Sequence, residues 1–246
     1  MKIALFSDIH ANLPAFESVL RSIEEQKPDA IYCLGDLVGY SVWPNEVIDA
    51  IRMRQISTIS GNHDAKVRGL SEIQLTESGK DYAYSIIGGD QRRYLATLPS
   101  HIRVEFKFNY ESIRLLLVHG SPSSNEEYLL EEKPEHEFLN VFQNADCDIL
   151  CFGHSHKPYH RVLTKAWENQ HQYYHAINTG SVGKPKDGDP RACYVLSNIH
   201  DSIDRFDAES IDVHFVRVEY DVEIAAKAIE KSSLPAEFAE MLRKAY

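Results

Sequence analysis

The stretch that decides the fold covers residues 2–64, in which an apolar run is followed three times by a short polar cluster. The three copies read KIALFSDIH at residues 2–10, AIYCLGD at residues 30–36 and ISTISGNHD at residues 56–64. Between them lie two amphipathic segments that begin at Pro14 and Pro44, a position at which proline favours a helix start. The pattern therefore predicts a βαβαβ unit with a parallel sheet and right-handed crossovers.

The rest of the chain adds strands and helices without a visible linker or internal repeat. Residues 72–97 have a helical pattern weakened at Gly88-Gly89, and residues 109–111 are typical of a turn. Strands are predicted at residues 102–108, 113–118, 148–152, 159–163, 173–177, 193–196 and 213–218, and helices at residues 134–143 and on both sides of Pro235. We therefore expect one domain over residues 1–246, with antiparallel strands after the parallel units.

Composition argues against several classes of function. The 246 residues include 26 Lys and Arg against 37 Asp and Glu, which gives a formal net charge of −11. Such an acidic chain is a poor partner for duplex nucleic acid or an anionic membrane. No apolar run approaches the length of a membrane span, and the first residues do not resemble a secretory signal. The four cysteines are irregularly spaced and are expected to be buried hydrophobes, which favours the reducing cytoplasm.

The polar clusters hold side chains suited to metal binding. Parallel strands end at one edge of a sheet, where ligands bind, so these clusters should converge. Two later apolar runs end in the same way, in His119-Gly120 and in Gly153-His154-Ser155-His156. The clusters supply seven oxygen or nitrogen ligands: Asp8, His10, Asp36, Asn62, His119, His154 and His156. Seven are too many for one tetrahedral zinc site, so the sequence predicts two ions that share Asp36, an arrangement used in phosphoryl transfer.

Each motif alone is also typical of an ordinary loop. Asp-x-His and Gly-Asp occur in capped turns. Residues 61–64 would suit a plain strand-to-helix turn, and residues 153–156 a polar loop. The metal interpretation depends on the combination of the motifs, in strand order, each directly after an apolar run.

In this order the motifs resemble those of the calcineurin-like metallophosphoesterase superfamily, and most of all its small prokaryotic phosphodiesterase-type members. Asn12-Leu13-Pro14 and the segment NTGSVG at residues 178–183 add to the resemblance, which spans residues 8–183. It implies an α/β fold of mixed α+β type, a four-layer α/β/β/α sandwich with two mixed sheets, and two divalent ions per chain. One ion would be held by Asp8, His10, Asp36 and His156, and the other by Asp36, Asn62, His119 and His154. These ligand types fit manganese, iron, zinc, nickel or cobalt.

The same resemblance makes His63 the histidine that acts without binding metal. It adjoins Asn62, so an imidazolium there lies close to the ions and can assist a leaving alkoxide. Asp64 is expected either to orient this ring or to cap the helix that follows. The nucleophile would be a hydroxide that bridges the two ions.

One departure from the related families is informative. Phosphoprotein phosphatases and symmetrical dinucleoside tetraphosphatases follow Gly-Asp with an Asp-Arg pair, whose arginine clamps phosphate. Here Gly35-Asp36 runs into Leu37-Val38-Gly39-Tyr40, which disfavours those two substrate classes. Lys184, Lys186 and Arg191 follow residues 178–183 and would either contact substrate phosphate or lie in a solvated loop, which is the expectation.

Taken together, the sequence predicts a metal-dependent hydrolase of a small phosphoester, with a diester preferred over a monoester. One alternative is a nucleotide or dinucleoside polyphosphate hydrolase that uses the same centre. The other is a non-catalytic protein-binding scaffold of the same fold, since a fold does not guarantee chemistry. The complete ligand set and the retained His63 favour the enzyme. The substrate, the metal and the oligomeric state stay open.

Overall fold

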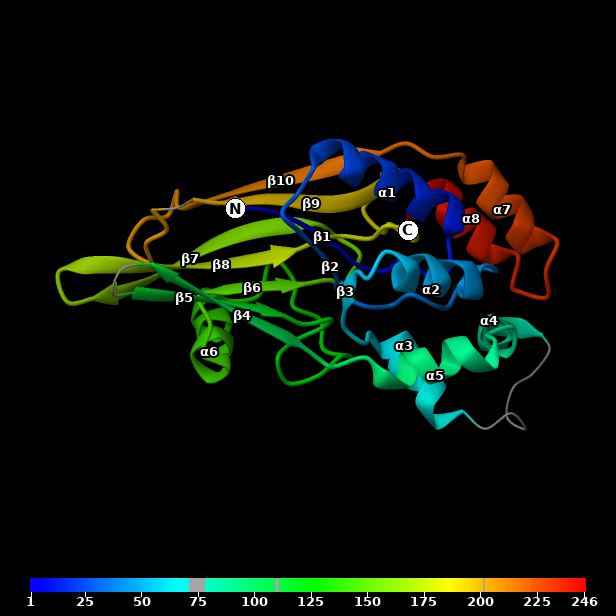
Figure 1. Ribbon diagram of the computed structural model, residues 1–246, viewed down its shortest axis with the longest axis horizontal. Coiled ribbons are helices and arrows are strands. Elements are labelled where there is room, and N and C mark those ends of the chain that lie inside the picture. Colours follow the sequence, from blue (N-terminus) through cyan, green and yellow to red (C-terminus); the bar gives the residue numbers. More distant parts are fainter. Residues whose placement is uncertain (71–77, 109–110, 201) are drawn as a thin grey trace.

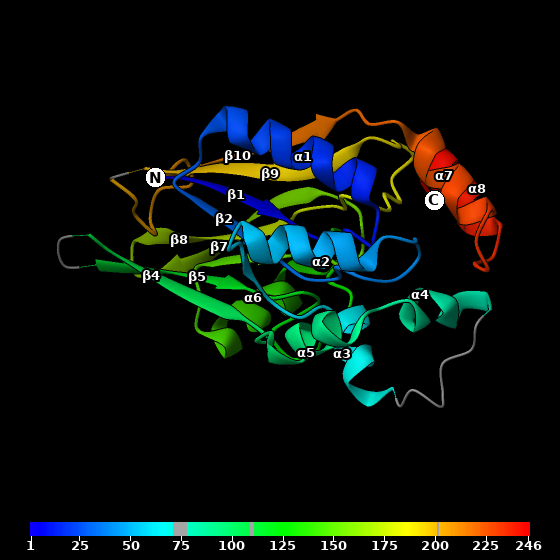
Figure 2. The ribbon, with the colours of Figure 1, turned by 45° about the vertical axis from the view of Figure 1, so that its right-hand side comes forward.

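Two five-stranded sheets lie face to face in the computed structural model, with helices on their outer sides (Figures 1 and 2). The structure describes residues 1–70, 78–108, 111–200 and 202–246. The helical pattern predicted for residues 72–77 and the turn predicted at 109–110 lie outside the described residues. The first sheet has the strand order β10-β9-β1-β2-β3 and the second β4-β5-β6-β8-β7. The predicted mixed α/β sandwich of two mixed sheets is confirmed.

The first sheet contains the predicted βαβαβ unit. Its strands are β1 (Lys2–Phe6), β2 (Ala30–Cys33), β3 (Ser57–Thr58), β9 (Ala192–Ile199) and β10 (Ile211–Val218). β1, β2 and β3 are parallel neighbours, and they are connected through α1 (Leu13–Gln26) and α2 (Pro44–Met53). β9 and β10 join antiparallel on the other side of β1, as expected for the later strands.

The second sheet differs from the expectation of antiparallel strands. Its strands are β4 (Ile102–Phe108), β5 (Glu111–Leu117), β6 (Ile149–Phe152), β7 (Tyr159–Trp167) and β8 (Gln170–Asn178). β6 pairs parallel with both β5 and β8. α6 (Glu135–Ala145) provides the crossover from β5 to β6, whereas the chain passes from β6 to β8 through β7, which is antiparallel to β8. The β7–β8 hairpin is longer than predicted and pairs as far as Trp167 and Gln170.

The remaining helices surround one end of the sandwich. They are α3 (Asn62–Gly69), the 3₁₀ turn η2 (Gly79–Asp81), α4 (Tyr82–Ser85), α5 (Gly89–Thr97), α7 (Val222–Glu230) and α8 (Glu237–Lys244). The weakness predicted at Gly88-Gly89 is a helix boundary, since α4 ends before it and α5 begins at Gly89. None of the helices in the described ranges has both the length and the apolarity that a membrane crossing requires.

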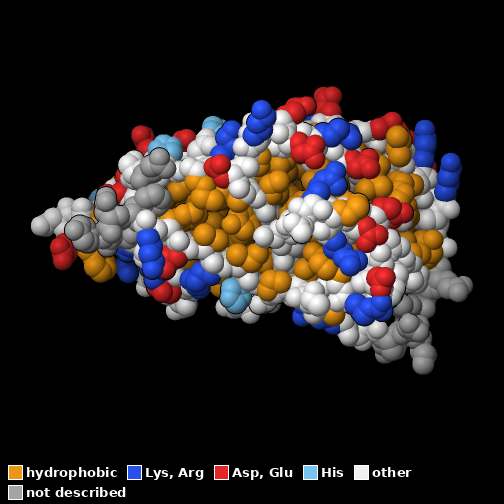
Figure 3. Space-filling model, in the orientation of Figure 1, with side chains coloured by type: hydrophobic (Ala, Val, Ile, Leu, Met, Phe, Trp, Pro, Cys, Tyr) orange, Lys and Arg blue, Asp and Glu red, His pale blue; other side chains and the backbone are white. Residues whose placement is uncertain are grey.

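Three apolar layers hold the sandwich together. The first packs α1 and α2 on the outer face of the first sheet, with Phe16 and Val19 against Phe6. The second lies between the sheets, where Leu5 faces Leu115 and Leu117. The third packs α6 on the second sheet. Acidic and basic side chains are interspersed on the face shown in Figure 3. The polar strand ends are thus fixed by a continuous core on both sides.

Candidate metal centre

The predicted polar clusters converge at one end of the two sheets. The loops after β1 and β2 lie side by side, because the N–H of Asp8 donates to Gly35 O (3.0 Å) and the N–H of His10 to Asp36 O (2.9 Å). The two sheets are joined at the same place, where the N–H of His154 donates to Asp8 Oδ2 (3.0 Å). All seven predicted ligands therefore lie near one another, although they come from five separate segments of the chain.

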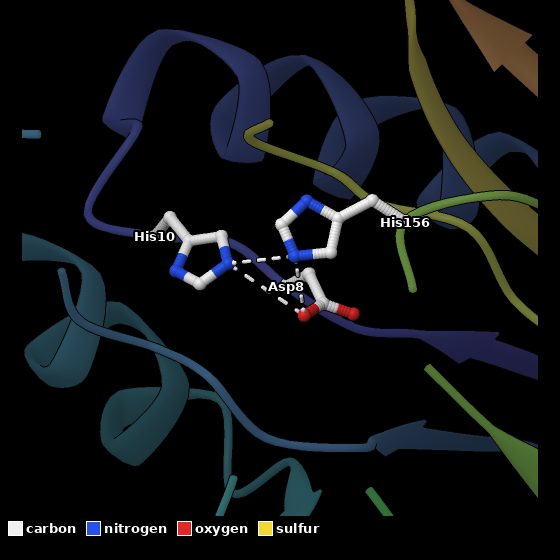
Figure 4. Close-up of side chains that lie close together, drawn as sticks. All are labelled: Asp8, His10 and His156. Carbon is white, nitrogen blue, oxygen red and sulfur yellow. Dashed lines mark hydrogen bonds and ion pairs between the residues drawn. The ribbon is translucent and has the colours of Figure 1, made fainter. Parts of the chain in front are cut away.

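The first group of ligand atoms consists of Asp8, His10 and His156 (Figure 4). Asp8 Oδ1 lies 3.1 Å from His156 Nε2 and 3.6 Å from His10 Nε2, and the two nitrogens are 3.2 Å apart. All three side chains are at most 3% exposed. One oxygen and two nitrogens thus face a common point inside the protein.

The second group consists of Asp36, His119 and His154, with Asn62 beside them. Asp36 Oδ2 lies 3.4 Å from His119 Nε2 and 3.7 Å from His10 Nε2, so this oxygen stands between the two groups. Asn62 Oδ1 is 3.0 Å from His119 Nε2.

Backbone carbonyls fix the orientation of three of the histidine rings. Nδ1 of His10 lies 3.0 Å from Val38 O, Nδ1 of His119 2.8 Å from Leu34 O, and Nδ1 of His156 2.5 Å from Lys184 O. A carbonyl oxygen only accepts, so each Nδ1 carries the hydrogen, and Nε2 of a neutral ring presents its lone pair to the centre. The facing lone pairs of His10 and His156 repel each other unless a cation lies between them.

Two buried atoms of the centre have no hydrogen-bond partner among the described residues, namely Asp8 Oδ1 and His154 Nε2. An unpaired buried polar atom is costly, so such atoms normally have a partner outside the protein chain. Carboxylate oxygens and imidazole nitrogens are good ligands for divalent transition metals. The residues present therefore fit metal ions.

The charges of the centre also favour cations. Burial lowers the pKa of His10 to about 3, which keeps this ring neutral. Burial acts in the same direction on His119, but the charge of Asp36 and its hydrogen bond outweigh it and raise the pKa to about 10. Burial opposes ionisation of Asp36, yet His119 and His63 together hold the pKa of this carboxyl below its usual range. Without metal, the proton on His119 is the positive charge beside Asp36.

Backbone strain is concentrated at the same place. Five of the seven predicted ligands have left-handed backbone conformations: Asp8 (φ 57°), His10 (49°), Asp36 (55°), His154 (65°) and His156 (60°). Each such conformation costs a non-glycine residue about 1–2 kcal/mol. Glycines make room for the carboxylates, since a side chain at Gly61 would collide with Asp36 and one at Gly153 with Asp8. Strain of this kind is typical of functional sites.

His63 lies at the edge of the centre, where a ring nitrogen is within 4.8 Å of ligand atoms of His10 and Asp36. Its Nδ1 is 2.5 Å from the hydroxyl of Tyr84, and the two rings are stacked. Burial lowers the pKa of His63, and the charge of Asp36 opposes this shift. The backbone N–H of His63 donates to Asp36 Oδ1 (2.8 Å).

Asp64 does not orient the His63 ring, which corrects one of the two roles considered for it. Its carboxylate accepts from the backbone N–H groups of Gly61 (3.0 Å), Asp36 (2.8 Å) and Leu37 (3.0 Å). Asp64 is thus the capping residue of α3, and it also ties this helix to the loop after β2. Although Asp64 is next to His63 in the sequence, its side chain faces backbone N–H groups. Tyr84 from α4 contacts the His63 ring instead.

Sequence reasoning missed three tyrosines around the centre: Tyr84, described above, Tyr40 and Tyr128. Tyr40 packs edge-on against His10, with ring centroids 4.8 Å apart, and Tyr128 stacks on His154 at 4.2 Å. Only Tyr40 carried a signal, since it follows the Gly-Asp motif where related families have a basic clamp. A cavity of about 460 Å³ adjoins Asn62 and His63 and is also lined by Tyr84, Asn125 and Glu126.

The expectation of a solvated basic loop is wrong for Lys184. Its side chain is only 3% exposed, because the loop after β8 turns into the site. Arg191 does lie outside, where it pairs with Asp189 at 2.6 Å. The basic group seen in the sequence therefore divides into buried and exposed members.

Comparison with known proteins gives the family. Residues 1–202 match the model of the calcineurin-like phosphoesterase superfamily domain. The uncharacterized protein MJ0912 of Methanocaldococcus jannaschii is 32% identical over 254 residues, which cover 98% of this chain and 96% of that protein. The phosphodiesterase YfcE of Escherichia coli K12 is 26% identical over 203 residues, covering 80% of this chain and 88% of that one.

Solved structures agree over the whole chain. A metallophosphoesterase from Sphaerobacter thermophilus has a TM-score of 0.75 at 26% identity, covering 100% of this chain and 99% of its own. The hypothetical protein PH1004 of Pyrococcus horikoshii OT3 has a TM-score of 0.77 at 24% identity, with 100% and 98% covered, and supports the fold. The predicted resemblance and the prediction of a metal-dependent phosphoester hydrolase are confirmed. The chain belongs to the calcineurin-like phosphoesterase superfamily.

Proposed function

We propose that the chain hydrolyses a small phosphodiester at a centre of two divalent ions, with His63 assisting the leaving group. The observation that carries the proposal is the position of Asp36, whose Oδ2 lies between His10 and His119. One carboxylate between two sets of donors is the arrangement that a shared ligand requires.

Asp8, His10, Asp36 and His156 would hold one ion, and Asp36, Asn62, His119 and His154 the other. Manganese is among the metals that suit these ligands, together with iron, zinc, nickel and cobalt. When bound, two such ions supply a hydroxide near neutral pH and positive charge for the phosphoryl oxygens.

The part of His63 follows from its contacts. Because Tyr84 holds Nδ1, the other ring nitrogen is left for the substrate. The ring lies beside Asp36, so a phosphoester at the centre would have an ester oxygen close to His63. The negative charge of that phosphoester would favour the imidazolium form and counter the effect of burial. The ring would then give a proton to the departing alkoxide.

Two observations support a diester. The cavity beside His63, about 460 Å³, has the size of a small-ligand site and would accommodate a second ester group. The related protein of Escherichia coli is named a phosphodiesterase.

We also propose a single domain over residues 1–246 and, because all four cysteines are buried free thiols, a cytoplasmic location.

The test is His63→Ala in the metal-loaded protein. We expect both ions to remain while turnover of alkyl or ribose esters falls about 10²–10⁴-fold, the usual contribution of a positioned general acid. The loss should be small for nitrophenyl esters, whose leaving group needs no proton. His136→Ala is the matched control, because His136 is exposed on α6.

Equal losses across leaving groups would contradict the role given to His63. No hydrolysis of any phosphoester by the metal-loaded wild type would contradict the proposed function as a whole and favour a scaffold.

A further inference from the structure

Lys184 is a buried cation without a counter-ion. Its side chain is 3% exposed, and in the part of the chain that the structure describes its ammonium has no hydrogen-bond acceptor or carboxylate partner. Its Nζ lies 4.8 Å from the centre of the Tyr40 ring. A cation–π contact offsets only part of the cost of burying a charge, so this position favours an anion.

The backbone of Lys184 is fixed to the metal centre. Its carbonyl accepts from Nδ1 of His156, and its N–H donates to Ser181 Oγ (2.8 Å), which in turn donates to Asp8 O (2.8 Å). The ring of Tyr40 contacts the Lys184 ammonium and also packs on His10 and His63. The ammonium is thus about one ring away from the ligands.

Lys186 adds a second cation at the same place. Its N–H donates to His156 O (3.4 Å), and within the described ranges its ammonium has no hydrogen-bond acceptor or carboxylate partner. The side chain of Lys186 is partly buried, two residues after Lys184 on the same loop. Two ammonium groups on one loop beside the centre, neither paired with a carboxylate in the described part of the chain, would be stabilised together by one anion.

We propose that Lys184 and Lys186 form an anion subsite beside the metal centre, which binds a second anionic group of the substrate. Among the described residues the Lys184 ammonium contacts the ring of Tyr40 and none of the predicted ligands, so we assign it an anion other than the scissile phosphoryl group, either phosphate or carboxylate. Calling this anion part of the substrate rests on the proposed function. The substrate class is then a phosphoester that carries a further negative charge.

Binding of stable phosphonates to the metal-loaded protein tests the subsite without catalysis. Propylphosphonate has one anionic group, 3-phosphonopropionate adds a carboxylate, and propane-1,3-diphosphonate adds a phosphonate. By isothermal titration calorimetry we expect one or both of the last two to bind the wild type about tenfold more tightly than propylphosphonate, the value of one hydrogen bond to a charged group. The tighter of the two identifies the anion.

Lys184→Met and Lys186→Met should each remove most of this preference and leave the affinity for propylphosphonate within about twofold. Lys184→Arg, which keeps the positive charge, should retain part of the preference that Lys184→Met loses. Arg191→Met is the control, because Arg191 follows the same loop but is exposed and paired with Asp189. If Lys184→Met does not fold or retain metal, Lys186→Met decides, since that side chain is partly exposed.

Two results would overturn the proposal: no preference in the wild type, or equal weakening of all three ligands in the variants, which would place the lysines on the scissile group. A preserved preference in a protein that hydrolyses no phosphoester would overturn the proposed function and leave the subsite standing.

Discussion

Replacing Tyr84 by phenylalanine tests whether His63, the proposed general acid, is held in place from α4, a helix separate from its own. The change removes one hydroxyl, which lies 2.5 Å from His63 Nδ1, and keeps the ring that stacks on the imidazole. Burial raises the pKa of Tyr84 well above its usual value, so the phenol stays protonated at every pH of interest. The hydroxyl donates to Nδ1 of a neutral ring and accepts from Nδ1–H of an imidazolium, and it fixes the ring in both states.

The expected loss of turnover in Tyr84→Phe follows from the contacts that the His63 ring keeps. One hydrogen bond to a charged group contributes about 1.5–3 kcal/mol, or roughly 10–150-fold. The ring is still packed by Tyr40 and His10, with centroids 4.9 and 5.0 Å away, so we expect the lower end, about tenfold. The loss should appear with alkyl esters and fall below about twofold with nitrophenyl esters, because only the former need the proton.

The assay is kcat across a series of phosphodiesters of increasing leaving-group pKa, with metal content measured for each variant. Tyr194→Phe is the matched control, because Tyr194 is also buried and its hydroxyl has one partner, Ser22 on α1, which is not a residue of the centre. Tyr84→Phe should add no further loss in a His63→Ala background. The same loss for every leaving group, or full additivity with His63→Ala, would refute a role exerted through His63.

Two further predictions concern the metals. Elemental analysis should find about two divalent ions per chain, and Asp36→Ala should lose both or nearly both; a single ion that persists in the variant would exclude the shared ligand. Metal binding should release about one proton from His119, whose pKa of about 10 keeps it protonated in the metal-free protein, whereas His10, with a pKa of about 3, contributes none. Metal affinity should therefore rise about tenfold per pH unit from pH 7 to 9. Calorimetry in buffers of different ionisation enthalpy measures the number of protons released on metal binding. A metal affinity that does not depend on pH would contradict the release from His119.

The parts of the fold that depend on local pattern could be predicted from the sequence. Apolar runs with a period of two, amphipathic segments after Pro14 and Pro44, and polar residues directly after strands located most elements and all seven candidate ligands. The parallel pairing of β6 with β5 and β8 could not be read in this way. Strand pairing depends on how the crossover helix packs, and the strand sequences alone leave the order open.

In the site, too, the contacts of single side chains could not be predicted from the local sequence. Asp64 sits next to His63 in the sequence, but its carboxylate accepts from the N–H of Gly61 at the start of α3 and from the N–H groups of Asp36 and Leu37 in the loop after β2. Tyr84 contacts the ring from α4, and no local pattern connects the two. Lys184 was expected in a solvated loop, and it does lie in a loop, but the anchoring of its backbone to Asp8, through Ser181, and to His156 explains its burial.

The backbone strain in the loops and the repulsion between His10 and His156 both bear on metal affinity. The left-handed conformations of five predicted ligands and the facing nitrogens of His10 and His156 are unfavourable in the protein chain alone. The core layers on both faces of the two sheets hold these side chains in place before any ion binds. A cation relieves the repulsion directly and gives Asp8 Oδ1 and His154 Nε2 the partner that they lack. Part of the metal affinity is therefore supplied by the fold, and metal binding should stabilise the strand ends more than the rest of the sandwich.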